Sequence, residues 1–352
     1  MRVGCGNNRG EEPPWLLNAA PLPPQAATSA NAWHKKEIHQ STALVHDPSR
    51  DSLDALRPHL VSAKAANVLS EFTKQLDVAR PVNVAQVRQI SPFRYPGGKT
   101  WLVPVAREWL QMIDRPRVLL EPFAGGAVIG LTAAAEGLAD KVVLVEIDDD
   151  VSAVWEVLIN GADRSVTMLS SKILRFDVTR DNVREVLDGT PRTTVERAFR
   201  TIVKNRTQRG GIMAPGAGLV KEGEAGRGLR SRWYPETLVK RFDTIRQFRD
   251  RITFMQGDAF DAIRSNPGAA MFVDPPYTAA GKRAGSRLYT HTELDHRQLF
   301  DDVANYAGPA LLTYDDSDEI RNMAVENGFQ VGNVAMKSTH NVVMRELTIF
   351  KA

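Results

Sequence analysis

A series of short apolar runs, alternating with segments of helical periodicity, is the feature that most limits how this chain can fold. The runs cover residues 118–120, 142–145, 252–256, 269–273 and 310–313. Strands that alternate with helices in this way are typical of a mostly parallel, doubly wound α/β sheet. The alternating residues 342–350, which follow a short connection, predict that the sheet closes with an antiparallel hairpin.

The composition is that of an ordinary globular protein, and it excludes several classes. A chain of 352 residues is long enough for about two domains. No apolar run approaches the roughly 18–20 residues that cross a bilayer, and the N-terminus lacks the apolar core of a secretory signal. Cys5 is the only cysteine, which excludes intrachain disulfides and cysteine metal clusters, and the 7 histidines have no zinc-ligand spacing. We therefore expect a cytoplasmic protein without a structural metal.

Changes in composition along the chain predict its organisation. Residues 1–50 are rich in Pro, Ala, Asn, Ser and Gln, show no period, and are expected to be disordered. Residues 51–91 are expected to form a helical extension, which either packs on the main body or is offered to a partner. Residues 92–160 and 250–352 contain the predicted strands, and residues 161–249 form a mainly helical insert.

The tetrapeptide Asp274-Pro275-Pro276-Tyr277 follows the apolar run at 269–273. Its carboxylate is therefore placed at the carboxyl end of a strand, the edge at which open α/β sheets bind ligands. Two prolines remove two backbone donors, and their carbonyls can then accept hydrogen bonds from outside the chain. With the tyrosine ring beside them, these acceptors suit a flat heterocycle that carries an exocyclic amine. A strand-terminating turn with a half-buried tyrosine is the alternative interpretation.

Two further strand ends carry residues suited to a nucleoside. The first run leads into the glycine-rich turn Phe123-Ala124-Gly125-Gly126, and the second run ends at Glu146. An acidic residue about 20 residues after such a turn is where a nucleoside-binding βαβ unit has its ribose partner. A solvated acidic loop around Glu146 is the alternative. The third run ends close to Asp258 and Phe260, which are expected at the same edge and placed to clasp a purine.

The formal net charge of +3 hides a strongly basic segment. Between Arg192 and Arg251 there are 15 Lys and Arg against 6 Asp and Glu, so the rest of the chain is mildly acidic. This bias favours an anionic partner, nucleic acid in particular, over a solvated basic helix surface. Arginines interleaved with glycines and aromatic residues suit contacts to phosphates and base edges. Trp233 and Tyr234 suit two roles equally well: contact with DNA, or packing of the helix that follows them against the core.

Four blocks, in order, resemble the Dam-type family of DNA adenine-N6 methyltransferases over roughly residues 92–351: Tyr95-Pro96-Gly97-Gly98-Lys99, the glycine-rich turn, the basic insert and Asp274–Tyr277. The first block lacks the spacing of a nucleotide triphosphate loop. The resemblance implies a Rossmann-like methyltransferase fold with a DNA-recognition insert. It also implies S-adenosylmethionine as methyl donor, no metal, and methyl transfer to N6 of an adenine flipped out of duplex DNA. A monomer acting on double-stranded DNA is implied as well, and a cognate restriction endonuclease is left open.

The residues that the resemblance implies fall into three groups. For catalysis they are Asp274 and the Pro275 carbonyl, which accept hydrogen bonds from the N6 amine, and Tyr277, on which the base stacks. For the methyl donor they are Tyr95 and Lys99, with Lys99 near its carboxylate, Phe123 and Gly125 at its methionine part, Glu146 at its ribose, and Asp258 and Phe260 at its adenine. For DNA they are Asn205, Arg206, Arg209, Arg230 and Arg232.

The sequence departs from the family pattern in the insert. The segment between Asn205 and Trp233 lacks the extended aromatic- and proline-containing hairpin of GATC readers, so the resemblance does not extend to GATC specificity. Glu146 stands where aspartate is commoner, which preserves the carboxylate. One alternative keeps the fold but uses cytosine N4, RNA or a protein glutamine as acceptor, and the leading Asp274 disfavours it. The other is a non-catalytic DNA-binding regulator, which the presence of Lys99 and Asp274 disfavours.

Overall fold

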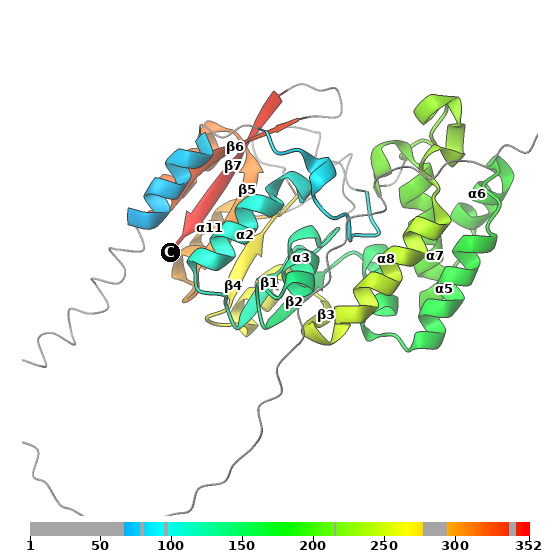
Figure 1. Cartoon of the computed structure of the whole chain (residues 1–352), viewed down its shortest axis with the longest axis horizontal. Helices are drawn as coiled ribbons and strands as arrows, with labels where there is room; N and C mark the ends of the chain where they lie inside the picture. Colours follow the sequence, from blue (N-terminus) through cyan, green and yellow to red (C-terminus); the bar gives the residue numbers. More distant parts are fainter. Residues whose placement is uncertain (1–66, 78–80, 95–97, 215, 277–293, 338–342) are drawn as a thin grey trace, which may run out of the picture. The chain divides into compact units, whose positions relative to one another are not determined.

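The computed structural model describes residues 67–77, 81–94, 98–214, 216–276, 294–337 and 343–352, all within the compact unit formed by residues 53–352. The segment 1–50, predicted to be disordered, lies outside these residues. In the described part a seven-stranded sheet carries helices on both faces (Figure 1). The predicted mostly parallel, doubly wound α/β sheet is confirmed. Among the helices of this part, none combines the length and the apolar character that crossing a bilayer requires.

The sheet has the order β3-β2-β1-β4-β5-β7-β6. Its strands are β1 (Val118–Glu121), β2 (Lys141–Glu146), β3 (Ile252–Gln256), β4 (Ala270–Val273), β5 (Ala310–Asp315), β6 (Gln330–Lys337) and β7 (Val343–Lys351). β1 to β5 are parallel, and β7 runs antiparallel to both β5 and β6. The predicted antiparallel closure is therefore present. β6 was not predicted, because Gly332 and Asn333 interrupt its apolar pattern.

The winding of the sheet reverses between β1 and β4. From β1 the chain continues outward to β2 and β3, and it then returns to the other side of β1 for β4 and β5. β1 and β4 are direct neighbours, with Leu120 paired to Met271. The carboxyl ends of these two strands therefore flank the switch point, where open α/β sheets bind their ligands.

Alternate residues of each strand point to opposite faces of the sheet, so the sheet has two apolar layers. Leu119 of β1 belongs to one hydrophobic cluster and Leu120 to the other. The cluster around Leu119 includes helices α2 (Val103–Met112), α3 (Val128–Glu136) and α4 (Asp149–Trp155). The cluster around Leu120 includes α9 (Ala259–Ser265), α11 (His296–Asn305) and α12 (Asp318–Glu326).

The helix over residues 67–77 packs on the main body, which decides between the two alternatives left open for this segment. Its buried side chains Leu69, Phe72 and Leu76 join the same apolar layer as α2 and α3. The ring of Phe72 lies 5.6 Å from that of Phe350 in β7. Asp77, at the end of this helix, accepts a hydrogen bond from the backbone of Asn333 in β6 at 2.8 Å.

The region between β2 and β3 is helical and continuous with the same apolar layer. Its helices after α4 are a π-helical turn (Glu156–Asn160), α5 (Asp163–Arg175), α6 (Arg180–Asp188), α7 (Thr194–Thr207) and α8 (Pro235–Phe248). Trp233, just before α8, packs its ring 5.4 Å from that of Phe176 and is thus a core anchor. Tyr234 is 39% exposed, so the two aromatic neighbours have different environments.

Candidate active site

A cavity of about 1030 Å³ lies at the carboxyl ends of β1, β2, β3 and β4 and extends to the helical region between β2 and β3. It brings together nine of the residues singled out in the sequence: Lys99, Phe123, Gly125, Glu146, Arg206, Arg232, Asp258, Phe260 and Asp274. Pro276 also lines the cavity, whereas Pro275 is buried. Tyr95 and Tyr277 lie outside the described residues.

The glycine-rich turn after β1 has an open face. Gly125 has a φ of +46°, and no atom lies within 4 Å of the point that a side chain would occupy there. Its N–H donates to Glu146 Oε2 at 2.8 Å, and its carbonyl accepts from Trp155 Nε1 at 3.0 Å. These two hydrogen bonds fix the turn, and its backbone stays accessible to a ligand in the cavity.

Glu146, at the end of β2, has an unusual charge environment. Its Oε1 accepts a hydrogen bond from the Asp148 N–H at 2.9 Å, in addition to the bond from Gly125. Burial raises the pKa of Glu146 to about 7, with a further contribution from the charge of Asp148, against the backbone donors, which lower it. Each carboxylate oxygen has a second lone pair, so Glu146 can still accept from the hydroxyls of a ligand.

Asp258 and Phe260 are fixed at the start of α9. Asp258 caps the helix, and its Oδ1 accepts from the backbone N–H groups of Phe260 at 2.8 Å and Asp261 at 3.2 Å. This cap places the half-buried Phe260 ring at the cavity. A hydroxyl acceptor, an open glycine turn and an aromatic ring in one cavity fit a nucleoside cofactor such as S-adenosylmethionine.

Asp274 follows β4 directly and is held by Lys99 and Thr313, and Lys99 is in turn held by Glu346. Lys99 Nζ lies 3.0 Å from Asp274 Oδ1 and 3.1 Å from Glu346 Oε1. Thr313 in β5 donates its hydroxyl to the same Asp274 oxygen at 2.9 Å. The side chain of Asp274 is 25% exposed, whereas those of Lys99 and Glu346 are almost fully buried. The Lys99 ammonium therefore lies between two carboxylates of the protein, and its expected contact with the carboxylate of the methyl donor stays a prediction.

Glu121, at the end of β1, lies beside this group and was not singled out in the sequence. It is buried, and its Oε2 accepts from the Gly130 N–H in α3 at 2.7 Å. Burial raises the pKa of Glu121 well above its usual range, the Gly130 N–H lowers it, and the negative charge of Asp274 raises it further. A side chain at Gly130 would meet this carboxyl at 2.4 Å, so the contact requires glycine.

Two more residues that support Asp274, Thr313 and Glu346, were also missed. Glu346 could have been found from its sequence context, because it is a charged residue inside the apolar strand β7 and is only 2% exposed. A buried charge in such a position requires a partner, and Lys99 is that partner. Thr313 gives no comparable indication, since threonine is common in strands.

Asn205 is fully buried rather than presented to solvent. Its side-chain oxygen accepts from the Arg94 N–H at 3.0 Å, and its amide donates to the carbonyls of Arg94 at 2.9 Å and Gly211 at 3.0 Å. A side chain at Gly211, whose φ is +77°, would lie 2.1 Å from the Arg94 carbonyl oxygen. In this structure Asn205 therefore ties α7 to the segment that precedes Lys99.

The arginines expected to contact DNA have different surroundings. Arg206 is buried and donates to the Pro92 carbonyl. Arg230 pairs with Asp177 at 2.6 Å and donates to the Val178 carbonyl at 3.2 Å, which joins the loop before α8 to the loop before α6. Arg209 is exposed, and Arg232 is half-buried at the cavity.

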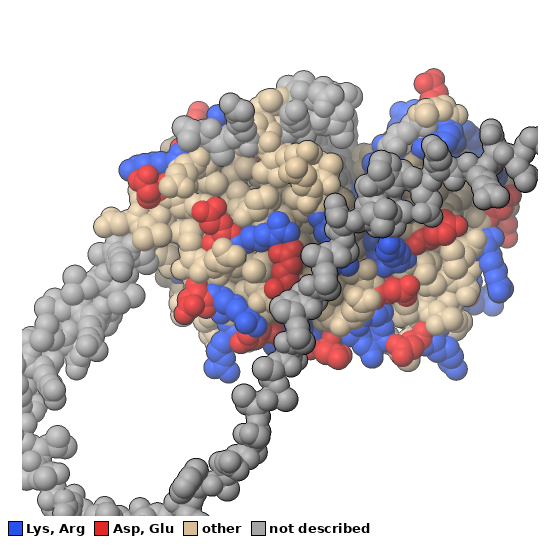
Figure 2. Space-filling view, viewed as in Figure 1, with Lys and Arg blue, Asp and Glu red and all other residues tan. Residues whose placement is uncertain are grey.

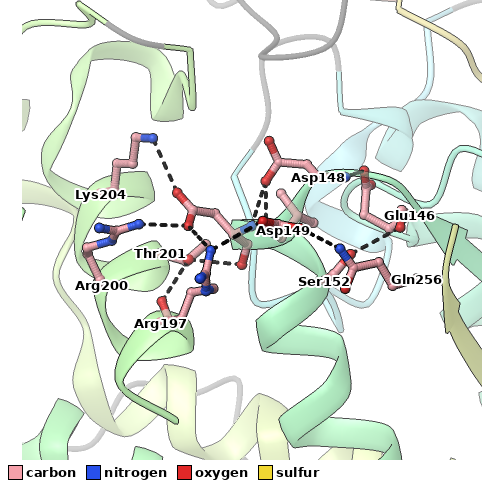
Figure 3. Close-up of polar contacts among 11 residues, drawn as sticks. Glu146, Asp148, Asp149, Ser152, Arg197, Arg200, Thr201, Lys204 and Gln256 are labelled. Carbon is pink, nitrogen blue, oxygen red and sulfur yellow. Dashed lines mark hydrogen bonds and ion pairs between the residues drawn. The ribbon is translucent and has the colours of Figure 1, made fainter. Parts of the chain in front are cut away.

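Several Lys and Arg side chains of the helical region pair with carboxylates of the protein itself. Asp150, in α4, lies 2.9 Å from Arg200 and 3.5 Å from Lys204, and its carbonyl accepts from the Thr201 hydroxyl. The side chains of Arg200 and Lys204 accordingly point from α7 toward α4 (Figure 3). Arg246 similarly pairs with Asp163. Figure 2 accordingly shows Lys and Arg interspersed with Asp and Glu over this region, not a surface of one sign. The count of charges in the sequence therefore overestimates the cations available to DNA.

Comparison with known proteins identifies the family. The model of D12 class N6 adenine-specific DNA methyltransferases matches residues 95–339, more than two thirds of the chain. The chain belongs to this family. The resemblance noted from the four sequence blocks is confirmed, and the family implies adenine-specific methyl transfer, S-adenosylmethionine as methyl donor and DNA as substrate.

No curated protein matches the chain. Solved structures that the chain matches include a Pyrococcus horikoshii protein named as an RNA methyltransferase, with 12% identity, a TM-score of 0.33, and coverage of 79% of this chain and 96% of that one. The precorrin-6y C5,15-methyltransferase of Geobacter metallireducens has 11% identity, a TM-score of 0.31, and coverage of 71% and 85%. The rRNA methyltransferase aviRa of Streptomyces viridochromogenes has 13% identity, a TM-score of 0.32, and coverage of 78% and 94%.

Proposed function

We propose that this D12 class enzyme acts as a monomer that methylates N6 of an adenine everted from duplex DNA, at a specific sequence, with Asp274 as its catalytic residue. The observation that carries the proposal is that Asp274 lines the same cavity as Gly125, Glu146 and Phe260. A carboxylate at the switch point of the sheet thus shares one cavity with a nucleoside-like subsite. At about 1030 Å³ this cavity has room for a nucleoside cofactor and a purine base together.

One end of the cavity suits the methyl donor. We assign Glu146 to the ribose hydroxyls, the Gly125 turn and Phe123 to the methionine part, and Asp258 with Phe260 to the adenine. S-adenosylmethionine, when bound there, supplies an electrophilic methyl group on a sulfonium. Glu146 and Gly125 are linked by a hydrogen bond of 2.8 Å, so the ribose and methionine subsites have a fixed spacing.

Asp274 acts on the target amine. An adenine amine is a poor nucleophile because its lone pair is delocalised into the ring. A carboxylate that accepts an N6 hydrogen bond from outside the ring plane favours a pyramidal nitrogen and localises that lone pair. The Pro275 carbonyl is proposed as the second acceptor and Tyr277 as the stacking partner of the everted base, which partly offsets the cost of eversion. Preorganised electrostatics of this kind is a large source of catalysis.

Lys99 is proposed to position Asp274. Its ammonium and the Thr313 hydroxyl both lie on Oδ1, which fixes the rotation of the carboxyl group. Glu346 completes the arrangement, because it balances the charge of a lysine that is itself buried. Contact of Lys99 with the carboxylate of the methyl donor stays a prediction.

The proposal is tested by incubating the full chain with S-adenosylmethionine and plasmid DNA of diverse sequence, followed by nucleoside digestion and mass spectrometry. The expected product is N6-methyladenine, and single-molecule sequencing of the same DNA gives the methylated sequence. N4-methylcytosine as the sole product, or an absence of methylated nucleoside with folded protein that binds S-adenosylhomocysteine, overturns the proposal.

A further inference from the structure

Four arginines converge on the cavity where it meets the helical region. Arg94 precedes in sequence the short 3-10 helix Lys99–Leu102, Arg206 lies in α7, Arg232 ends the short helix Gly228–Arg232, and Arg241 lies in α8. All four line the cavity. Arg241 Nη1 donates to the Ser91 carbonyl at 2.7 Å, and the backbone of Arg94 is held by Asn205. The cluster is thus built into the fold from four separate segments of the chain.

Arg206 is the most deeply buried member, with 4% of its surface exposed. One of its terminal nitrogens donates to the Pro92 carbonyl. Its Nε is buried and has no hydrogen-bond partner within the described part of the chain. A buried, unsatisfied guanidinium donor is costly, and the cost is removed when an anion accepts from it.

The surroundings of Arg206 repel its charge. Burial lowers the pKa of Arg206 to about 9, and the charges of Arg241, Arg94 and Arg232 contribute in the same direction. Burial and the charge of Arg94 also lower the pKa of Arg241. Mutual repulsion among cations that the fold holds together is relieved by a bound oxyanion.

We infer that Arg94, Arg206, Arg232 and Arg241 form a site for one backbone phosphate of the DNA strand, next to the everted adenine. This inference rests on the proposed function. Guanidinium groups match phosphate oxygens in pairs, which makes arginine the usual residue for such sites. The phosphate holds the strand at the mouth of the cavity while the base attached to it enters.

The carboxylate of the methyl donor is the alternative oxyanion for these four arginines, and the net charge of the donor disfavours it. The donor carries an ammonium and a sulfonium besides its carboxylate, so four arginines would meet a molecule that is a net cation. A DNA strand, in contrast, brings one negative charge with each nucleotide. The number of cations therefore fits DNA better.

The test uses duplexes that contain the methylated site of the wild-type enzyme, with each phosphate near the target adenine replaced in turn by an uncharged methylphosphonate. Binding is measured by fluorescence anisotropy with saturating S-adenosylhomocysteine, which cannot donate a methyl group. For the wild type, one linkage is expected to cost about tenfold in affinity. On unmodified DNA, Arg241→Gln and Arg94→Gln are expected to bind about tenfold more weakly than the wild type. Replacing the phosphate at that linkage is expected to weaken the binding of these variants no further. The matched control is Lys240→Gln, an exposed neighbour of Arg241 on α8, which keeps the wild-type linkage profile.

Two results overturn the inference. One is that both arginine variants lose affinity at the same replaced phosphates, and by the same factors, as the wild type. The other is a loss of S-adenosylhomocysteine affinity, measured by calorimetry, with DNA binding unchanged, which assigns the cluster to the carboxylate of the donor. If the wild type methylates no DNA, the proposed function fails, but the site is still tested on any duplex. In that case Arg241→Gln lowers the slope of log affinity against log salt by about 0.9, and an unchanged slope contradicts the site.

Discussion

The ammonium nitrogen of Lys99 lies 3.0 Å from Asp274 Oδ1, and both side chains border the same cavity. Glu346 holds the same ammonium from its other side at 3.1 Å, which makes the C-terminal strand β7 part of the support of Asp274. Residues far apart in the sequence thus fix one carboxylate at the switch point of the sheet. Several expectations for variants depend on this arrangement.

Replacing Glu346 by Gln is expected to reduce the rate of methyl transfer about tenfold and leave S-adenosylhomocysteine affinity within twofold of the wild type. The reason is that Lys99 loses a charged partner, and its position against Asp274 becomes less fixed. Folding stability is expected to fall by about 1–3 kcal/mol. Single-turnover kinetics, calorimetry and urea denaturation measure the three quantities.

Glu326→Gln, which changes an exposed glutamate of α12 that pairs with Arg297, is the control and should alter none of them. Equal losses of rate and cofactor affinity in Glu346→Gln would point to general disruption of the cavity instead.

Cofactor affinity is expected to depend on pH through Glu146, whose pKa is raised to about 7. The ionised carboxylate is the better acceptor for ribose hydroxyls, so affinity for S-adenosylhomocysteine should fall as the pH decreases from about 8 to 6. In Glu146→Gln the affinity should be lower, by about tenfold, and should lose this dependence. Calorimetry at a series of pH values checks both. A wild-type dependence that persists in the variant would assign the titration to another group.

The raised pKa of Glu146 also predicts how folding stability depends on pH. Its pKa is higher in the folded protein than the ordinary value of 4.5, so protonation favours the folded state. The stabilising contribution is complete below pH 4.5 and is lost as the pH rises through about 7. Glu146→Gln should therefore gain stability relative to the wild type between pH 5 and pH 8. Thermal melts of the two proteins at several pH values measure the difference, and a constant difference would be inconsistent with the raised pKa.

Asn205→Ala is expected to destabilise the fold by about 1–3 kcal/mol, because it leaves buried backbone groups of Arg94 and Gly211 without their partner. DNA binding should weaken as a consequence, since Arg94 belongs to the arginine cluster. Urea denaturation gives the stability and anisotropy gives the affinity. Asn305→Ala, which removes an exposed amide that donates to the Asp301 carbonyl in α11, should change stability by no more than about 0.5 kcal/mol. A stable Asn205→Ala protein with weak DNA binding would instead favour direct contact of Asn205 with DNA.

The sequence predicted the sheet well because each strand carries its own local information. Apolar runs and the turns after them placed β1 to β5 and the strand ends that meet at the cavity, and the two-residue period placed β7. β6 was missed because Gly332 and Asn333 break its pattern. Its pairing with β7 is local, since Lys337 pairs with Val343, and the antiparallel closure was therefore predicted although β6 itself was not.

The roles of charged residues were harder to predict, since charge in a sequence does not reveal its partner. Arg200 and Lys204 could not be distinguished from DNA-binding residues until Asp150 was found beside them. Likewise, no pattern in the sequence indicated that Lys99 pairs with Glu346, which lies in β7, more than 200 residues along the chain. In contrast, Asp274 and Glu146 were placed by their positions directly after apolar runs, and these local positions are retained in the structure.

Replacement of Asp274 by Asn tests the central claim most directly, because it keeps the size of the side chain and removes its charge. Single-turnover methyl transfer to the identified DNA site should fall by about 10²–10³-fold, while calorimetry should give an S-adenosylhomocysteine affinity within threefold of the wild type. An Asp274→Asn enzyme that transfers the methyl group at the wild-type rate would contradict the account.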